Sequence, residues 1–396
     1  MPLNGSWLMI NIPVDIFRGI FSFCIDAGPV SFPLRGTPMQ LTLSQVCSFW
    51  RKIMLDTPST WNDVMVGPFS DYDQACDISS RMDEWLSRSG DSLTSLDLGT
   101  LIEARPRTTQ DLLHKYRFKK LRMITPTDQL STLFLIPAEN LCHVEELTLF
   151  QGYTGEKSHY QRSDSRSRGL GKRPFFPRHE FPLLKTLTTD VNPAIHDVVH
   201  ALSWGQLRRL DMRADMPLVP CMDILRQCPL LETLNLEMVS SPLSQLVGQP
   251  SPKSDAEPLL LSHLNELYIE FARSDICDKM LGMLILPELR TLSLFYVASE
   301  PAKLGSLEGL VTGRLGPQLQ ALNVKDSLDI TLILDIIETR CKISARDGSD
   351  PGHAFQAPQA TLKLIDLSDA DVSGSDQERI DILRAKGLEI NTGLSW

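Results

Sequence analysis

Apolar residues recur along most of this chain in a short phrase, with three hydrophobic positions spaced three and then two residues apart. One clear example is formed by Leu231, Leu234 and Leu236. Apolar residues at alternate positions are typical of a strand with one buried face. We find ten such phrases, one of which, Leu184 and Leu187, has only the first two apolar positions. Their middle residues are Leu96, Leu121, Leu147, Leu187, Leu210, Leu234, Leu267, Leu292, Leu322 and Ile365.

Prolines keep the same phase as these phrases. Four of them stand five residues before a middle leucine, at Pro182, Pro229, Pro287 and Pro317. Proline lacks an N–H and has a fixed φ, so it suits a turn that leads into a strand and is excluded from the paired interior. Helical periodicity lies between several of the phrases, at 195–202, 222–225, 280–284 and 332–337. The pattern therefore predicts units of turn, short strand, loop and helix.

A single unit of this kind cannot bury its strand leucines, whereas stacked units can. Most steps between middle residues are close to the roughly 20–29 residues of leucine-rich repeats. The chain resembles leucine-rich-repeat proteins in a degenerate form, because the asparagine that usually follows the strand is absent from most units, as at 237–239. The resemblance implies an α/β solenoid over 91–396 with a parallel sheet on its concave face. Insertions interrupt it near 151–180, 240–258 and 343–360.

The first ninety residues follow a different pattern. Apolar residues at 12, 16, 17, 20 and 21 predict an amphipathic helix with Pro13 near its start. A second helical stretch is predicted over 41–54, ending before Thr57 and Pro58. It places these residues on one face: Leu43, Val46, Cys47, Trp50 and Ile53. A segment of this size with so many apolar groups is close to the limit for independent stability, which favours a partner.

The phrase "IPVDIFRGIF…LSQVCSFWRKIMLDTPSTWNDV" resembles the F-box, the helical motif that docks on the Skp adaptor of cullin-RING ubiquitin ligases. Residues 82–98 resemble the link between F-box and repeats in the fungal group of F-box proteins with leucine-rich repeats. The resemblance implies an all-α F-box domain at 10–66 and a helical linker at 67–90. The chain departs from the motif at three places. Ile12 stands where leucine is usual, Asp15 stands where glutamate is usual, and the loop 26–40 between the two helical stretches is long.

By this resemblance six residues face the adaptor, namely Pro13, Ile16, Ile20, Leu43, Val46 and Trp50, whereas Trp61 fixes the motif to its own linker. The alternative is a helical cap that shields the first repeat and keeps these residues in its own core. The concave face of the repeats would hold the target protein. Its candidate residues are Arg209, Arg213, Glu237, Tyr268, Glu270 and Phe295, and a merely solvated face is the alternative reading.

The implied function is a non-catalytic substrate-recognition subunit of an SCF-type ubiquitin ligase, with an adaptor and, through it, a cullin as partners. The alternative is an interaction scaffold whose F-box-like cap is structural and not associated with a cullin. The target protein, and any modification that its recognition needs, stay open.

Composition narrows the class of protein. The 396 residues are 42% hydrophobic and 22% charged, as in ordinary globular proteins. The net charge of −10 argues against a surface that coats nucleic acid or anionic membrane. No run approaches the ~18 apolar residues of a membrane helix, and residues 1–11 do not form a signal peptide. We therefore expect a soluble protein of the cytoplasm, the nucleus or both, with its eight cysteines as buried free thiols.

Candidate chemistry is sparse. His196 and His200 have the spacing of a zinc-binding helix, but the glutamate of that motif is replaced by Asp197 and no third ligand follows at a characteristic distance. We therefore expect no metal, no cofactor and no catalytic residues, and interpret the two histidines as surface residues. The basic stretch 157–178 could bind nucleic acid or act as a nuclear-import signal, although a Ser-rich loop is the favoured reading.

Overall fold

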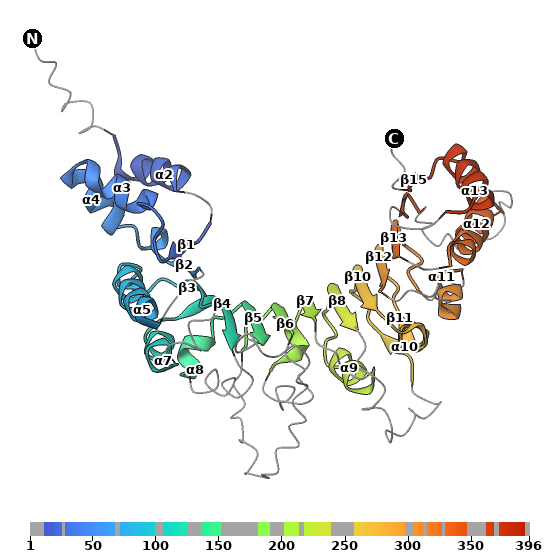
Figure 1. Ribbon diagram of the computed structural model, residues 1–396, viewed down its shortest axis with the longest axis horizontal. Helices are drawn as coiled ribbons and strands as arrows, with labels where there is room; N and C mark the ends of the chain where they lie inside the picture. Colours follow the sequence, from blue (N-terminus) through green and yellow to red (C-terminus); the bar gives the residue numbers. More distant parts are fainter. Residues whose placement is uncertain are drawn as a thin grey trace, which may run out of the picture. The chain divides into compact units, whose positions relative to one another are not determined.

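Figure 1 presents a computed structural model of the chain. The structure describes residues 12–25, 28–67, 72–99, 106–125, 136–151, 181–190, 202–213, 218–238, 257–297, 304–311, 315–326, 329–346, 362–367 and 372–392. These residues form a mixed α/β fold with parallel strands and eleven α-helices. The chain divides into two compact units, which are residues 1–184 with 200–202 and residues 185–199 with 203–396.

The first unit begins with helices and continues as alternating strands and helices. Its elements are α2 (Val14–Cys24), β1 (Val30–Phe32), α3 (Met39–Val46), α4 (Ser48–Leu55), η1 (Pro58–Thr60), β2 (Asp63–Val66), α5 (Tyr72–Ser87), β3 (Thr94–Asp97), α7 (Pro106–Lys115), β4 (Phe118–Thr125), α8 (Ala138–Leu141) and β5 (Glu146–Gln151). Each of its strands pairs in parallel with the next one along the chain, from β1 to β5. Helices α5 and α7 lie on one side of β3 and β4 (Figure 1).

The second unit repeats this alternation. Its elements are β6 (Thr186–Thr189), η4 (Trp204–Gln206), β7 (Arg209–Met212), α9 (Leu218–Leu225), β8 (Thr233–Met238), β9 (Leu259–Leu260), β10 (Glu266–Phe271), α10 (Ser274–Met283), β11 (Leu284–Ile285), β12 (Thr291–Tyr296), η6 (Gly305–Leu307), α11 (Glu308–Val311), β13 (Ala321–Asp326), α12 (Ile330–Arg346), β14 (Leu364–Asp366), α13 (Gly374–Ala385) and β15 (Glu389–Asn391).

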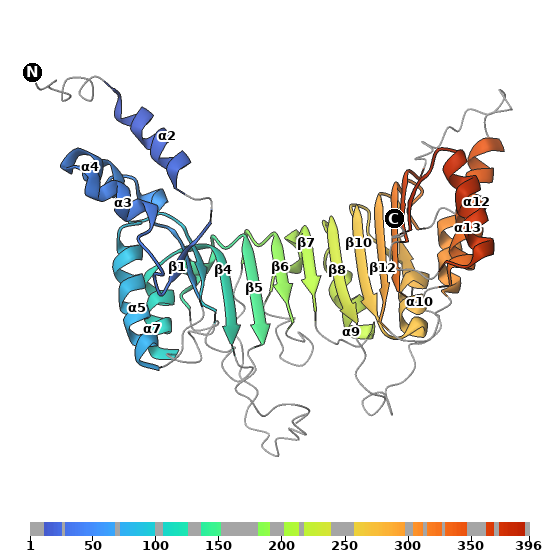
Figure 2. The same ribbon diagram turned by 45° about the horizontal axis from the view of Figure 1, so that its top comes forward.

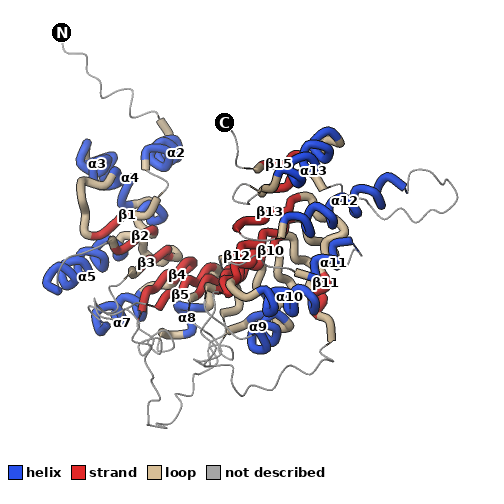
Figure 3. Tube along the Cα trace, turned by 45° about the vertical axis from the view of Figure 1, so that its right-hand side comes forward, coloured by secondary structure: helices blue, strands red, loops and turns tan. Residues whose placement is uncertain are grey.

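Strands of the second unit lie side by side in the order β6-β7-β8-β10-β12-β13-β14-β15, all parallel. Figure 2 shows the part of this order from β6 to β12. Strands β9 and β11 form a separate parallel pair. Helices α10 and α11 lie on one side of β10, β12 and β13 (Figure 3). The opposite side of these strands is therefore the face on which side chains remain accessible.

The register of the strands confirms the predicted phase. All ten predicted middle residues lie in strands. In the second unit they stand directly opposite one another, as Leu234 does to Leu267 and Leu267 to Leu292. Within these strands the apolar residues at alternate positions are buried. The buried leucines of neighbouring strands therefore form the core between one strand–helix repeat and the next.

The four prolines occupy equivalent turns. At each one, the N–H two residues after the proline donates to the carbonyl oxygen of the residue before it. The distances are 3.1 Å at Pro182, 3.3 Å at Pro229, 3.4 Å at Pro287 and 3.0 Å at Pro317. Each proline thus stands at the second position of a four-residue turn, where its fixed φ is favourable and no N–H is needed. The interpretation of these prolines as strand-entry turns is confirmed.

Two sequence-based predictions for the first ninety residues are wrong. The segment 10–66 is not all-α, because β1 and β2 pair with each other and β2 also pairs with β3. Consequently the sheet continues across the predicted boundary at residue 66. The single helix predicted over 41–54 is two helices, since Cys47 is extended with φ −160° and ψ 169° and its Sγ accepts a hydrogen bond from the N–H of Trp50.

The predicted helices at 222–225, 280–284 and 332–337 correspond to α9, α10 and α12, and α5 lies within the predicted linker at 67–90. The helix expected at 195–202 lies almost wholly outside the described residues, as do most of the three insertions. Within the part of the chain that is described, no helix is both long and apolar enough to cross a membrane.

Candidate docking and recognition surfaces

Helix α2 has two apolar faces. Phe17 and Phe21 are buried, whereas Ile16 and Ile20 are about half exposed, at 54% and 47%. Residues spaced three or four apart share one side of a helix. Ile16, Ile20 and Phe23 therefore form one exposed line along the helix, which we call, together with the exposed Ile12 just before the helix, the docking stripe. Phe23, at its end, is 94% exposed.

The buried face of α2 packs on α4 through aromatic rings. The ring centroid of Phe21 lies 4.8 Å from that of Trp50, and the centroid of Phe17 lies 5.3 Å from that of Phe49 in an edge-on arrangement. Such tilted and edge-on pairs are favourable beyond the area that they bury. Because Phe17 and Phe21 hold the helix on α4, the docking stripe is turned away from α4.

A second aromatic cluster attaches the helices to the linker helix α5. The indole N–H of Trp61 donates to the carbonyl oxygen of Met54 at 2.9 Å, and the rings of Trp61 and Trp85 lie 4.8 Å apart. The guanidinium of Arg88 lies over the Trp61 ring at 4.8 Å. The interpretation of Trp61 as a residue that fixes this segment to its own chain is confirmed.

Of the six residues predicted to face an adaptor, Pro13, Ile16, Ile20 and Val46 are exposed and Trp50 is half-buried. Leu43 is only 7% exposed. The predicted contact of Leu43 with an adaptor is therefore corrected, because this side chain belongs to the buried core. The stripe nevertheless shows that the first helix carries more apolar surface than its own fold buries.

Sequence analysis missed several exposed apolar residues in this segment, namely Val14, Phe23, Met39, Phe49 and Leu55. Phe23 carried a signal that could have been used. It falls outside the periodic set at 16, 17, 20 and 21, although it completes the line begun by Ile16 and Ile20. The exposure of Phe49 could not be read from the sequence, because it depends on where α3 ends.

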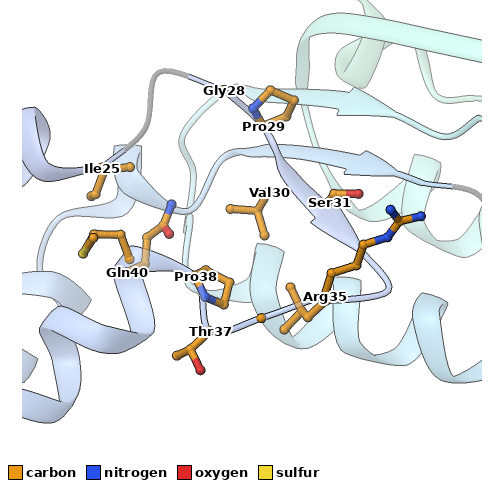
Figure 4. Close-up of a pocket in the computed structure, with 12 residues that line it drawn as sticks. Ile25, Gly28, Pro29, Val30, Ser31, Arg35, Thr37, Pro38 and Gln40 are labelled. Carbon is orange, nitrogen blue, oxygen red and sulfur yellow. The ribbon is translucent and has the colours of Figure 1, made fainter.

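A cavity of about 270 Å³ lies against β1 and the first residues of α3 (Figure 4). Residues 28–31 and 34–40 line most of it. Gln40 closes one side, and its buried amide donates to the carbonyl oxygen of Thr60 at 3.2 Å. The segment 28–40 thus contains the short strand β1 and a small cavity beside it.

In the second unit, polar side chains gather on the open face of β7, β8 and β10. They surround a cavity of about 310 Å³ lined by Asp211, Arg213, Asn235, Leu236, Glu237, Tyr268 and Glu270. Four of the six residues predicted to hold a target lie here, namely Arg213, Glu237, Tyr268 and Glu270. Alternation along the strands brings them together, as the sequence phase predicted.

The other two predicted residues lie outside the cavity lining. Phe295 is adjacent, because its ring centroid is 4.8 Å from that of Tyr268. The ammonium group of Lys325 lies 5.2 Å from the centre of the Phe295 ring. Arg209 is exposed at the first position of β7 and is not among the residues that line the cavity.

Charges in this cavity are unequally paired. The guanidinium of Arg213 donates to both carboxylate oxygens of Asp211, at 3.3 and 3.1 Å, and this pairing raises the pKa of Arg213. Glu237 and Glu270 stand directly opposite each other in the register of β8 and β10. Burial, followed by the charge of Glu270, raises the pKa of Glu237. The cavity therefore has excess negative charge.

Tyr268 joins the acidic pair to the aromatic side of the cavity. Its hydroxyl donates to Oε2 of Glu270 at 3.1 Å. Burial, together with this hydrogen bond to an anion, raises the pKa of Tyr268 to about 12. The phenol therefore stays protonated at neutral pH and acts as a hydrogen-bond donor and a flat apolar surface.

Metal and thiol chemistry receive little support from the described residues. Among them, no three His, Cys, Asp or Glu side chains are arranged to hold a metal ion. His196 and His200 lie outside the described residues.

Burial raises the pKa of the Cys221 thiol to about 12, so this thiol is protonated. The expectation of buried cysteines is wrong for Cys24 and Cys47, which are exposed, and for Cys142, which is half-buried.

The sequence matches no protein-family model and no curated protein. The functional argument therefore rests on the two surfaces, an apolar one on α2 and an acidic and aromatic one on β7, β8 and β10.

Proposed function

We propose that this protein is a substrate-recognition subunit of an SCF-type ubiquitin ligase. In this proposal α2, α3 and α4 form an F-box that docks on a Skp-family adaptor, and the stacked strand–helix units form a leucine-rich-repeat solenoid that holds the target. The protein supplies proximity between the target and the conjugating enzyme and no catalytic group.

The docking stripe is the observation that carries the proposal. Nine of the fifteen large exposed hydrophobic residues in the described part of the chain lie between residues 12 and 55. Such a concentration of apolar surface marks a site of protein interaction. A helix that presents anchors at spacings of three and four residues is a recurring mode of docking in a partner's groove.

Burial on the other side of α2 supports docking over the structural-cap alternative. Phe17 and Phe21 already attach the helix to α4, so Ile16, Ile20 and Phe23 are not needed for that attachment. A cap that only shields the first repeat has no use for an outward line of large apolar residues, because each of them favours aggregation.

The target-binding half of the proposal is supported by the topology. The strands that carry the middle leucines pair in parallel in chain order from β8 through β10 and β12 to β13, and these leucines are in register. Stacking of this kind produces an extended surface made of equivalent positions from successive units, as in repeat proteins that bind other proteins. Equivalent positions on that surface carry different residue types, which is what selective recognition needs.

The deciding experiment compares two isoleucines of equal exposure. Ile16 on α2 is 54% exposed and Ile382 on α13 is 52% exposed. The full chain is co-expressed with a tagged Skp-family adaptor, and the complex is isolated by affinity and size-exclusion chromatography. We expect Ile16→Glu to abolish co-purification of the adaptor and Ile382→Glu to leave it unchanged.

Adaptor capture that is equal in both variants and in the parent chain would contradict the proposal and favour the structural cap. Circular dichroism of both variants verifies folding, since a glutamate at an exposed helical position changes stability by only ~0.5 kcal/mol. A second step tests for the cullin in the same purified complex, which distinguishes a ligase subunit from a scaffold that uses the adaptor alone.

A further inference from the structure

The open face of β7, β8, β10 and β12 has a charge pattern that specifies its occupant. Residues three positions after the middle leucines form one row across these strands, in the order Arg213, Glu237, Glu270 and Phe295. The row thus contains one cation, two adjacent carboxylates and an aromatic ring. Helices of this unit lie on the other side of the strands (Figure 3), so the row is available to a partner.

The two carboxylates in the middle of the row are the unusual feature. Like charges placed directly opposite on neighbouring strands, which lie ≈ 4.8 Å apart, repel each other. The nearest cation, Arg213, already bonds both oxygens of Asp211 on its own strand. Among the described residues, neither Glu237 nor Glu270 takes part in an ion pair. The charge of Arg213 opposes the effect of burial and of Glu270 on Glu237, but the pKa of Glu237 is still raised, so the pair keeps an excess of negative charge that a cationic partner would offset.

An aromatic wall stands beside the acidic pair. The rings of Tyr268 and Phe295 lie 4.8 Å apart with an angle of 38° between their planes. Tyr268 also bonds Glu270 at 3.1 Å, which holds its ring next to the carboxylate. A planar guanidinium can accept both parts of this site, because it bonds carboxylates at its edge and stacks on aromatic rings with its face. An ammonium group lacks the flat face.

We propose that this cavity on β7, β8 and β10 binds an arginine side chain from a positively charged segment of the target protein. The guanidinium lies between Glu237 and Glu270, and its face stacks on Tyr268. Charge complementarity selects the segment, and the 310 Å³ cavity receives the side chain. That the bound segment belongs to a ubiquitination target rests on the proposed function. That the cavity binds an arginine side chain does not.

The test uses the full chain and labelled pentapeptides in which glycine alternates with arginine, lysine or glutamine. Fluorescence anisotropy measures their affinities. We expect the arginine peptide to bind and the glutamine peptide not to bind. Glu237→Gln combined with Glu270→Gln is expected to weaken arginine binding at least about 100-fold, since both charged hydrogen bonds to the guanidinium are lost. Tyr268→Leu is expected to remove most of the preference for arginine over lysine.

The matched control removes two charges elsewhere. Glu266 lies on the same strand as Glu270 but outside the cavity lining, and Glu308 lies on α11. Glu266→Gln combined with Glu308→Gln is expected to weaken binding less than about threefold, as for exposed charges. Neither double variant is expected to unfold the protein. Replacing Glu237 and Glu270 by glutamine removes the repulsion between their two carboxylates.

Two outcomes overturn the inference: equal weakening by both pairs of variants, or equal binding of the arginine and glutamine peptides. Adaptor capture is measured on the same proteins and separates this inference from the proposed function. If arginine selectivity is absent while the adaptor is captured, this inference alone fails. If the adaptor is not captured while arginine selectivity is present, the ligase assignment alone fails.

Discussion

The indole N–H of Trp61 donates a hydrogen bond to the carbonyl oxygen of Met54, and the two atoms are 2.9 Å apart. Both residues are almost fully buried. This bond ties the end of α4 to the residue that follows η1 and leads into β2. The neighbouring indole of Trp85 is also buried, but its N–H has no hydrogen-bond partner. The two buried tryptophans therefore differ in whether the indole N–H forms a hydrogen bond, and substitution can measure the effect of this difference on stability.

We predict that Trp61→Phe is more destabilising than Trp85→Phe. Both substitutions remove part of a buried ring, but only the first also removes a hydrogen bond. The carbonyl oxygen of Met54 still accepts from the N–H of Thr57 at 3.2 Å, so the loss of the indole donor costs ~0.5–1.5 kcal/mol. The measurement is chemical denaturation followed by circular dichroism. Equal losses in the two variants would show that the Trp61 hydrogen bond contributes nothing to stability.

Two glycines give a second contrast. Gly316 has φ +59°, and a Cβ there would lie 3.1 Å from the carbonyl oxygen and 3.2 Å from the Cβ of Leu289. Gly19 lies within α2, with nothing within 4 Å of an added Cβ. We predict that Gly316→Ala lowers the free energy of unfolding by ~1–3 kcal/mol. Gly19→Ala should raise it by ~0.5–1 kcal/mol because alanine favours a helix.

Thermal melting of both alanine variants checks this prediction. A neutral effect of Gly316→Ala would mean that the turn before β13 can adopt another backbone conformation, contrary to the structure.

Asp83 makes stability depend on pH. Burial opposes its ionisation, but hydrogen bonds from Lys115 at 2.6 Å and Tyr116 at 2.7 Å outweigh burial and lower the pKa of Asp83 below its ordinary 3.8. A lowered pKa contributes stability above the unfolded value, and this contribution is lost as pH falls through the folded value. We predict that Asp83→Asn removes this contribution at neutral pH.

The melting temperatures of the parent chain and Asp83→Asn, measured from pH 7 down to pH 2, should therefore converge in acid. Tyr116→Phe removes one of the two hydrogen-bond donors to Asp83. In a chain that carries Tyr116→Phe, adding Asp83→Asn should therefore lower the melting temperature at neutral pH by less than it does in the parent chain. If the difference between parent and Asp83→Asn stays constant over this range, the contacts between α5 and α7 do not depend on the Asp83 charge.

The repeats were predictable because one residue type marks the phase. Once Leu234 and Leu267 are identified as equivalent, Glu237 and Glu270 follow as neighbours on the open face, and the register confirms it. The cavity around them was not predictable, since its depth depends on side-chain positions. Strand β15 was not predicted either, because Ile390 is its one buried apolar residue and the repeated pattern of three apolar positions is absent around it.

The first ninety residues were harder to predict for a physical reason. Helix α2 has large apolar residues on two sides, and periodicity alone does not say which side faces the protein. Contacts from α4 decide it, because the rings of Phe49 and Trp50 take up Phe17 and Phe21. Strand β1 is only three residues long, and it forms because β2 offers an edge to pair with. Tertiary contacts of this kind leave no local pattern.

Adjacent residues of α2 should therefore have opposite roles. Phe21 is buried with its ring 4.8 Å from that of Trp50, whereas Ile20 is about half exposed on the docking stripe. We predict that Phe21→Ala lowers the free energy of unfolding of the helical segment by ~3–5 kcal/mol. Ile20→Ala should change that free energy by less than ~0.5 kcal/mol and should weaken adaptor capture. Denaturation and adaptor pull-down on the same two proteins measure both effects, and a loss of stability in Ile20→Ala would place that residue in the core instead.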